Sequence, residues 1–166
     1  MDGTLCYPSP YCSKEFLELP LSDQHIFAQT LDFQKLCVES PLASWVSEYE
    51  LRFFRKEFFQ ILVTARWFYM KDSTLTWLQR YGFNFDHIQF LNFNDFESCR
   101  NEKITFIQRV INNYPVEIGE ELVVYNILDD DLATIQKLMR LSVANRIGAV
   151  THFWLVENGQ LRNMEL

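Results

Sequence analysis

The alternation of short apolar runs with helical segments constrains the fold of this chain more than any other feature. The runs that we predict to be buried strands cover residues 58–64, 87–93, 121–128 and 149–156. Apolar residues recur at helical spacing over residues 44–56, 73–82, 101–113 and 132–141. Strands that alternate with helices imply a mainly parallel sheet covered on both faces, because right-handed crossovers place the helices there. We therefore predict an α/β fold with three layers.

One domain is expected to account for residues 1–166, because no linker, repeat or low-complexity stretch divides the chain. Residues 6–43 show no sustained period and are predicted to form an insert of loops and short helices. Asn158 and Gly159 are expected to turn the chain into a polar tail. No run approaches the roughly 20 apolar residues of a membrane span, and the amino end lacks signal-peptide character. An intracellular protein, cytoplasmic or nuclear, without a membrane partner is expected.

Charge and cysteine content exclude two common classes of protein. The formal net charge of −7 argues against a general nucleic-acid binder, which would carry a basic surface. The cysteines form no CxxC pair and have no histidines at a matching spacing, so we predict free thiols and no zinc site. The cysteines are Cys6, Cys12, Cys37 and Cys99.

Polar clusters follow the predicted strands at the edge where ligands bind in open parallel sheets. They are Asp-Gly-Thr at residues 2–4, Thr-Ala-Arg at residues 64–66 and three aspartates at residues 129–131. Lys103 joins them if its helix starts at the same edge. Together they offer carboxylates for Mg²⁺ and a hydroxyl and cations for phosphate oxygens, which are the groups that phosphoryl transfer requires.

Each cluster also has a plain structural explanation. Asp-Gly is a common turn dipeptide, and one acid of residues 129–131 is expected to cap the next helix. Thr64 suits a strand as a β-branched residue, and Arg66 and Lys103 could be surface charges. The order of the clusters is therefore more informative than any one of them.

That order resembles the motif series of the haloacid dehalogenase (HAD)-like hydrolase superfamily over residues 2–141. The most specific pieces are MDGTL at residues 1–5 and ILVTAR at residues 61–66. The resemblance implies a Rossmann-like sandwich and Mg²⁺-dependent hydrolysis of phosphomonoesters. The family's first motif reads Asp-x-Asp-Gly-Thr, whose second aspartate, the general acid and base, matches Asp2. Thr4 matches the threonine of the motif, and Met1 takes the variable position.

By the same resemblance, Thr64 would hydrogen-bond the transferring phosphoryl group, and Lys103 would neutralise its charge. Asp129 and Asp130, together with Asp2, would hold Mg²⁺. Arg66 has no fixed role in the family, and we assign it to a contact with the substrate phosphate.

The family's nucleophilic aspartate would precede Met1, and the chain does not contain it. The first strand of the family lies in the middle of the sheet, here between residues 58–64 and 121–128. Its loss would leave two buried strand edges without partners, which is costly. We therefore expect a truncated or misannotated gene product, with its first central strand missing and no activity as written. The rival expectation is a pseudoenzyme in which residues 16–21 fill the gap.

Insert lengths indicate an uncapped site, since residues 93–103 leave no room for a cap domain. In this family, uncapped sites go with large substrates such as polynucleotide ends or phosphoproteins, and residues 125–131 resemble HAD domains of RNA-repair proteins. One alternative is a non-catalytic HAD-like binding or scaffolding module. Another is a generic α/β interaction domain, in which Trp67, Phe68 and Tyr69 are core or interface residues and the acids cap helices.

Overall fold

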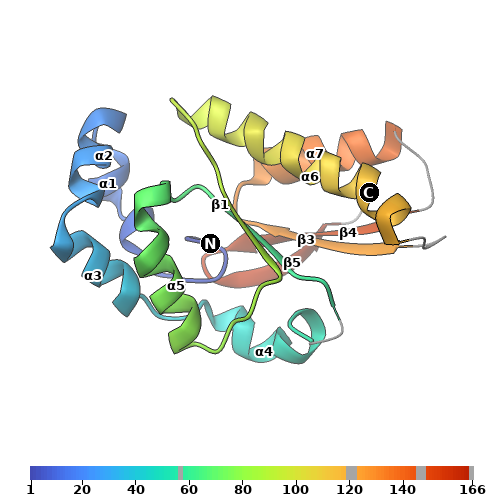
Figure 1. Cartoon of the computed structure of the whole chain (residues 1–166), viewed down its shortest axis with the longest axis horizontal. Helices are drawn as coiled ribbons and strands as arrows, with labels where there is room; N and C mark the ends of the chain where they lie inside the picture. The colour runs from blue at the N-terminus through green and yellow to red at the C-terminus, as the bar shows by residue number, and fades with distance from the viewer. Residues whose placement is uncertain (56–57, 119–122, 145–148, 165–166) are drawn as a thin grey trace.

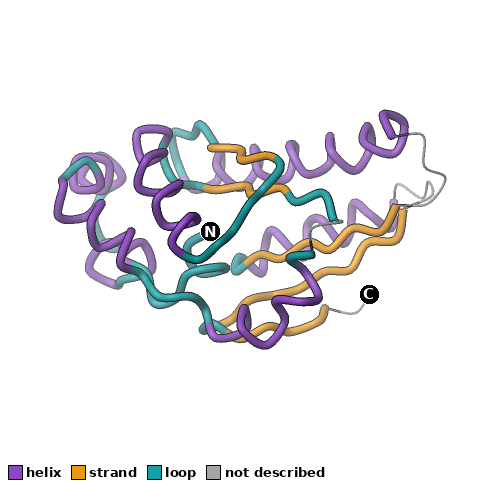
Figure 2. The backbone as a smooth tube through the Cα atoms, turned by 60° about the horizontal axis from the view of Figure 1, so that its bottom comes forward, coloured by secondary structure: helices purple, strands orange, loops and turns teal. Residues whose placement is uncertain are grey.

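The strands of the computed structural model form two separate sheets. The structure describes residues 1–55, 58–118, 123–144 and 149–164. One sheet pairs β1 with β2 in parallel, and the other has the order β3-β4-β5, with β3 and β4 parallel and β5 antiparallel to β4. Figure 2 shows the two sheets as distinct groups of strands. The strands are β1 (Ile61–Thr64), β2 (His87–Phe90), β3 (Val123–Asp129), β4 (Ala149–Glu157) and β5 (Gln160–Met164).

The prediction of a mixed α/β fold is confirmed, and four strands match the predicted runs. The first two residues of the run 121–128 lie outside the described residues, as does residue 56 of the first predicted helix. A mainly parallel sheet with its first central strand missing between residues 58–64 and 121–128 was expected, and the structure has a parallel pair, β1-β2, that is separate from the sheet β3-β4-β5. The prediction of a polar tail was wrong, because the residues after the turn at Asn158 and Gly159 form strand β5.

Helices surround these sheets, and the longest, α6, crosses the molecule beside α7 (Figure 1). Within the described ranges, no helix combines the length and apolar character needed to cross a membrane. The helices are α1 (Lys14–Leu17), α2 (Leu21–Ala28), α3 (Leu31–Glu39), α4 (Ser44–Phe53), α5 (Lys71–Arg80), α6 (Phe96–Ile118) and α7 (Leu132–Ala144), with 3-10 turns η1 (Pro10–Cys12) and η2 (Phe68–Met70).

Strand β4 links the two largest parts of the core because its successive side chains point to opposite faces. Phe153 and Leu155 pack with residues of α6 and α7, whereas Trp154 and Val156 pack with the amino-terminal segment, α4 and α5. All four side chains are buried. Helices therefore cover both faces of this sheet, as Figure 1 also shows.

The segment before α4 forms a small helical unit with its own core. Phe16 of α1 packs there with Phe33 and Cys37 of α3 and with Met70. The expectation that residues 16–21 fill a gap in the sheet is therefore wrong. The physical reason is local: Ser13 caps α1 by accepting a hydrogen bond from the Phe16 N–H, so this stretch is helical rather than extended.

Candidate functional site

The amino-terminal loop, residues 1–6, lies across the carboxyl ends of β1 and β3. It is a tight turn in which the Met1 carbonyl accepts hydrogen bonds from Leu5 N–H (2.7 Å) and Cys6 N–H (3.2 Å). Gly3 has a φ of +76°, a conformation that favours glycine. The buried Trp45 indole N–H donates to the Thr4 carbonyl at 2.7 Å and so fixes the loop to α4.

Asp2 joins this loop to the end of β1 through an ion pair with Arg66. The Arg66 Nε and Nη2 atoms donate to the two Asp2 carboxylate oxygens, each at 2.7 Å. The Arg66 side chain is fully buried, whereas 13% of the Asp2 side chain is exposed. Ser9 Oγ also donates to Asp2, at 2.6 Å, and the Cys6 thiol lies 3.2 Å from the same oxygen. Both oxygens of Asp2 are therefore occupied by side chains of this protein.

The environment of Asp2 strongly favours its charged form. Burial alone would raise the pKa of this carboxyl, but the charge and hydrogen bonds of Arg66 outweigh burial and hold the pKa well below its ordinary value of 3.8. A general acid at neutral pH needs a raised pKa instead. The expected roles of Asp2 in proton transfer and in metal binding stay predictions, and in this arrangement Arg66 occupies the carboxylate that would perform them.

Thr4 joins the loop to the end of β3. Its hydroxyl donates to Asp130 Oδ1 at 2.7 Å. The backbone of Gly3 lies so close to the same carboxylate that a Cβ atom at position 3 would overlap it. Burial raises the pKa of Asp130 above its ordinary value, and the charge of the neighbouring Asp129 carboxylate raises it further. Asp130 is thus an acid whose negative charge is not fully compensated.

Lys103, on α6, reaches the same end of β3. Its Nζ donates to Asp129 Oδ2 at 2.8 Å, while Asp129 Oδ1 accepts the Asp131 N–H at 2.9 Å. Burial works against the Lys103 ammonium, but the Asp129 carboxylate raises the pKa of Lys103, so Lys103 carries its positive charge. Thr64 is buried at the end of β1, where its hydroxyl oxygen accepts the Arg66 N–H at 3.2 Å.

Asp131 has the structural role that one of the three acids was expected to have. It accepts hydrogen bonds from Ala133 N–H and Thr134 Oγ1 in the first turn of α7, at 3.2 and 2.7 Å. Arg100 of α6 pairs with it at 2.6 Å, and both side chains are partly exposed. Burial alone would raise the pKa of Asp131, but the Arg100 pair and the hydrogen bonds of the cap outweigh burial and lower it.

The structure thus brings together the side chains that the sequence placed at strand ends. Asp2 binds Arg66, Thr4 binds Asp130, and Lys103 binds Asp129, all around one loop. Arg66, expected to contact a substrate phosphate, instead contacts Asp2; its substrate role stays a prediction. The prediction from the sequence did not include Ser9, Cys6 or Arg100 in the site. Only the nearness of Ser9 and Cys6 to Asp2 along the chain could have indicated two of them.

The donor set only partly suits Mg²⁺. Asp129 and Asp130 offer adjacent carboxylates, and magnesium sites often use one or two such groups. Both Asp129 oxygens already accept a hydrogen bond, from Lys103 Nζ and from the Asp131 N–H, so a metal would share them with these donors. Asp2 does not fit, because Arg66 binds both of its oxygens. Among the residues that the structure describes, no three His, Cys, Asp or Glu side chains are grouped as a metal would need.

An aromatic cluster follows β1 directly after Arg66. Trp67 stacks on Tyr69 and on Phe93, with ring centroids 5.8 and 5.7 Å apart. His25 of α2 packs edge-on against Trp67 at 5.2 Å. Phe68 is 68% exposed, so the aromatic residues 67–69 include both packed and surface side chains.

Comparison with protein-family models, with curated protein sequences and with solved structures found no match for this chain.

The pKa of Asp130 is raised and that of Asp131 is lowered, so we expect opposite effects when each charge is removed. Replacing Asp130 by Asn should raise the free energy of unfolding at pH 7 by up to about 1 kcal/mol, because it removes a charge that Asp129 repels and keeps an acceptor for Thr4. Replacing Asp131 by Asn should lower it by about 0.5–1 kcal/mol, since that charge pairs with Arg100 at a helix start. Urea unfolding of both variants measures the difference. A loss of stability in both would contradict the uncompensated charge at Asp130.

Proposed function

We propose that this chain is a HAD-like phosphohydrolase domain of the uncapped type, with a Rossmann-like sandwich, which lacks its nucleophilic carboxylate as written. The observation that supports the proposal is the meeting of the four predicted motifs around the amino-terminal loop, where contacts of Asp2, Thr4 and Lys103 join parts of the chain far apart in sequence. The substrate class would be large phosphomonoesters, such as polynucleotide ends or phosphoproteins, because an uncapped site is open.

Mg²⁺ would be held by Asp129 and Asp130 and would supply positive charge to offset that of a phosphate group. The raised pKa of Asp130 supports a cation at this place, since a carboxylate repelled by its neighbour is stabilised by an added positive charge. Lys103 would add a second positive charge at the end of β3, and Thr64 a hydroxyl at the end of β1.

Titration calorimetry with Mg²⁺ tests the proposal on the chain as it stands. The binding heat should be lost in Asp130→Asn and Asp129→Asn and retained in Asp131→Asn, because Asp131 serves α7 and Arg100. Equal heats in all of these variants would contradict a magnesium site at the end of β3.

The alternative is a non-catalytic HAD-like binding or scaffolding module. The Asp2–Arg66 ion pair favours it, because a carboxylate with a lowered pKa and two occupied oxygens is unsuited to proton transfer. Incubation with p-nitrophenyl phosphate and Mg²⁺ should then release no phosphate. Turnover that is abolished by Asp2→Asn would rule out the module and show that the chain is active without a further nucleophile.

A further inference from the structure

Aromatic rings lie beside the candidate site, at the carboxyl ends of β1 and β2. Trp67 and Tyr69 follow β1, and Phe93 follows β2, which is parallel to β1. Parallel strands end at the same edge of a sheet, so these rings share an edge with Arg66. The Arg66 guanidinium lies over the Tyr11 ring at 5.5 Å, and the Tyr11 and Trp67 ring centroids are 6.4 Å apart. The rings of Trp67, Tyr69 and Phe93, here named the stacking surface, therefore adjoin the candidate site.

The rings of the stacking surface are nearly parallel and are held in place. The planes of Tyr69 and Phe93 lie 14° and 20° from that of Trp67, with centroids 5.8 and 5.7 Å apart, so the rings overlap only in part. Tyr69 is 36% exposed, and Trp67 and Phe93 are half-buried. His25 packs edge-on against Trp67 and Tyr69, and the Tyr69 hydroxyl donates to the His25 carbonyl at 3.1 Å. A ligand would therefore meet aromatic faces that need little further ordering.

Parallel aromatic faces suit a flat, uncharged ring as their ligand. Nucleobases are such rings, and they stack on aromatic side chains of proteins that bind single strands. A quaternary ammonium group is bound instead within a cage of rings. Asn92 and Asn94 are exposed on either side of Phe93 in the chain. Their side-chain amides can donate and accept hydrogen bonds, as the edges of bases require.

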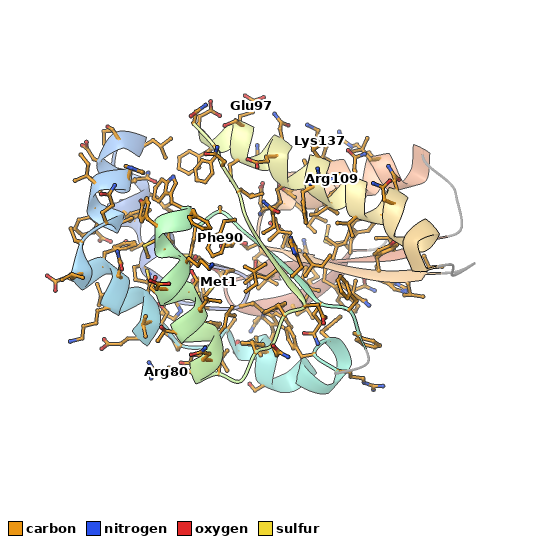
Figure 3. All side chains as sticks on the ribbon, in the orientation of Figure 1. Met1, Arg80, Phe90, Glu97, Arg109 and Lys137 are labelled. Carbon is orange, nitrogen blue, oxygen red and sulfur yellow. The ribbon has the colours of Figure 1, made fainter. Side chains whose placement is uncertain are left out.

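Positive charge contributes little at the stacking surface. Lys71 is close, with its Nζ 5.6 Å from the centroid of the Phe68 ring. Figure 3 shows that Arg109 and Lys137 lie on the outer helices, away from Phe90 at the end of β2. The whole chain has a formal net charge of −7. Binding here would therefore depend on ring contact more than on attraction of phosphate groups.

We propose that the stacking surface binds nucleobases, with the base of a phosphorylated nucleotide stacked on Trp67 and Phe93 while its phosphate lies at the candidate site. The choice of a base that carries a phosphate rests on the proposed function, whereas the ring geometry does not. The end of a single strand and a free nucleotide share this chemistry, and the experiment below separates them.

Tryptophan fluorescence of the full chain tests the proposal, because Trp67 is half-buried whereas Trp45, Trp77 and Trp154 are buried. A single-stranded tetranucleotide of deoxyadenosine should quench the fluorescence, since its bases stack on Trp67. The matched control is a tetranucleotide with the same phosphates and no bases, which should cause no quenching. Raising the salt from about 50 to about 200 mM should weaken binding less than about threefold, because few phosphates are neutralised.

Substitutions show whether the quenching comes from the stacking surface. Tyr69→Leu and Phe93→Leu should each weaken binding at least about fivefold by calorimetry, because each removes a ring and keeps an apolar side chain. Phe93→Tyr, which keeps the ring, should bind like the unmodified chain. Phe58→Leu is the matched control: Phe58 is 41% exposed but precedes the amino end of β1, so binding should not change.

Absence of quenching, equal quenching by the strand without bases, or equal losses in Phe58→Leu and Phe93→Leu would overturn the proposal. Quenching by maltotetraose but not by the tetranucleotide would assign the surface to carbohydrate and overturn it as well. Adenosine monophosphate separates the two sources of the base. Binding of the tetranucleotide at least about fivefold tighter supports a strand end, and equal affinities support a free nucleotide; both are base binding.

The result is independent of the Mg²⁺ titration. Base binding by a chain that gives no Mg²⁺ heat would support the stacking surface and contradict the magnesium site of the proposed function. Mg²⁺ heat that depends on Asp130 without base binding would overturn the stacking surface alone.

Discussion

Replacing Arg66 by Met should lower the free energy of unfolding by about 3–5 kcal/mol, the largest effect that we expect from a single substitution. The guanidinium is fully buried and binds both carboxylate oxygens of Asp2 at 2.7 Å. Methionine has a similar length but leaves the Asp2 charge buried without its cation. Urea unfolding of the variant at pH 7 measures the loss.

Two comparisons show whether the loss comes from the unpaired charge. Arg100→Met breaks the ion pair with Asp131, whose side chains are 40% and 32% exposed, and should cost at most about 1 kcal/mol. The double variant Asp2→Asn/Arg66→Met should be more stable than Arg66→Met alone, because no buried charge remains. A loss below about 1 kcal/mol in Arg66→Met would contradict a strong buried pair.

The contribution of this pair should also depend on pH. Arg66 holds the folded-state pKa of Asp2 below its ordinary value of 3.8, so the stability that the pair provides is complete above about pH 4 and is lost as the pH falls further. In Arg66→Met, burial should instead raise the pKa of Asp2. Protonation of Asp2 at low pH then removes the unpaired charge and the destabilisation that it causes. The difference in stability between the two proteins should therefore narrow from pH 7 to pH 3.

Replacing Gly3 by Ala should lower the free energy of unfolding by about 2–4 kcal/mol, from left-handed backbone strain and from loss of the Thr4–Asp130 contact. Gly3 has a φ of +76°, and its missing Cβ leaves the space that the Asp130 carboxylate occupies. An added methyl group must push Asp130 away from the Thr4 hydroxyl, to which it is bound at 2.7 Å.

Gly82 provides a matched control. Its φ of +73° is nearly the same, but no atom lies within 4 Å of the place that an added Cβ would take, so Gly82→Ala should cost only the backbone strain of about 1–2 kcal/mol. Removing the obstructing carboxylate in Gly3→Ala/Asp130→Ala should bring the cost of the glycine substitution closer to that of Gly82→Ala, although the Cβ of residue 130 stays 3.2 Å from the added methyl group. Equal costs for the single substitutions at Gly3 and Gly82 would contradict close packing of the loop against β3.

The order of the strands and helices could be predicted because apolar periodicity is a local property of the sequence. Strand β5 could not, since its residues are largely polar and only the Asn158–Gly159 turn, with φ of +51° and +76°, indicated a hairpin. The predicted run 58–64 began too early, because pairing with β2 starts at Ile61 while Phe58 and Phe59 are exposed.

The candidate site could be placed at the carboxyl ends of the strands, but its contacts could not be predicted. Asp2 and Arg66 are separated by 64 residues, and their pairing depends on how the turn at Gly3 directs the Asp2 side chain. Nothing in an Asp-Gly-Thr sequence indicates that an arginine will form an ion pair with its aspartate. Three adjacent acids likewise differ only in their surroundings: Asp129 binds Lys103, Asp130 accepts from Thr4, and Asp131 caps α7.

The buried position of Met1 has a practical consequence for producing this protein. Met1 is only 8% exposed and lines a cavity of about 590 Å³ between β1 and β3. A purification tag fused at the amino end would place its last residues beside that cavity, where a polar linker would disturb the packing of β1 and β3. Strand β5, which ends at Met164, contributes no residue to the described lining of that cavity. Proteins tagged at opposite ends should therefore differ in stability, although their sequences from Met1 onward are identical.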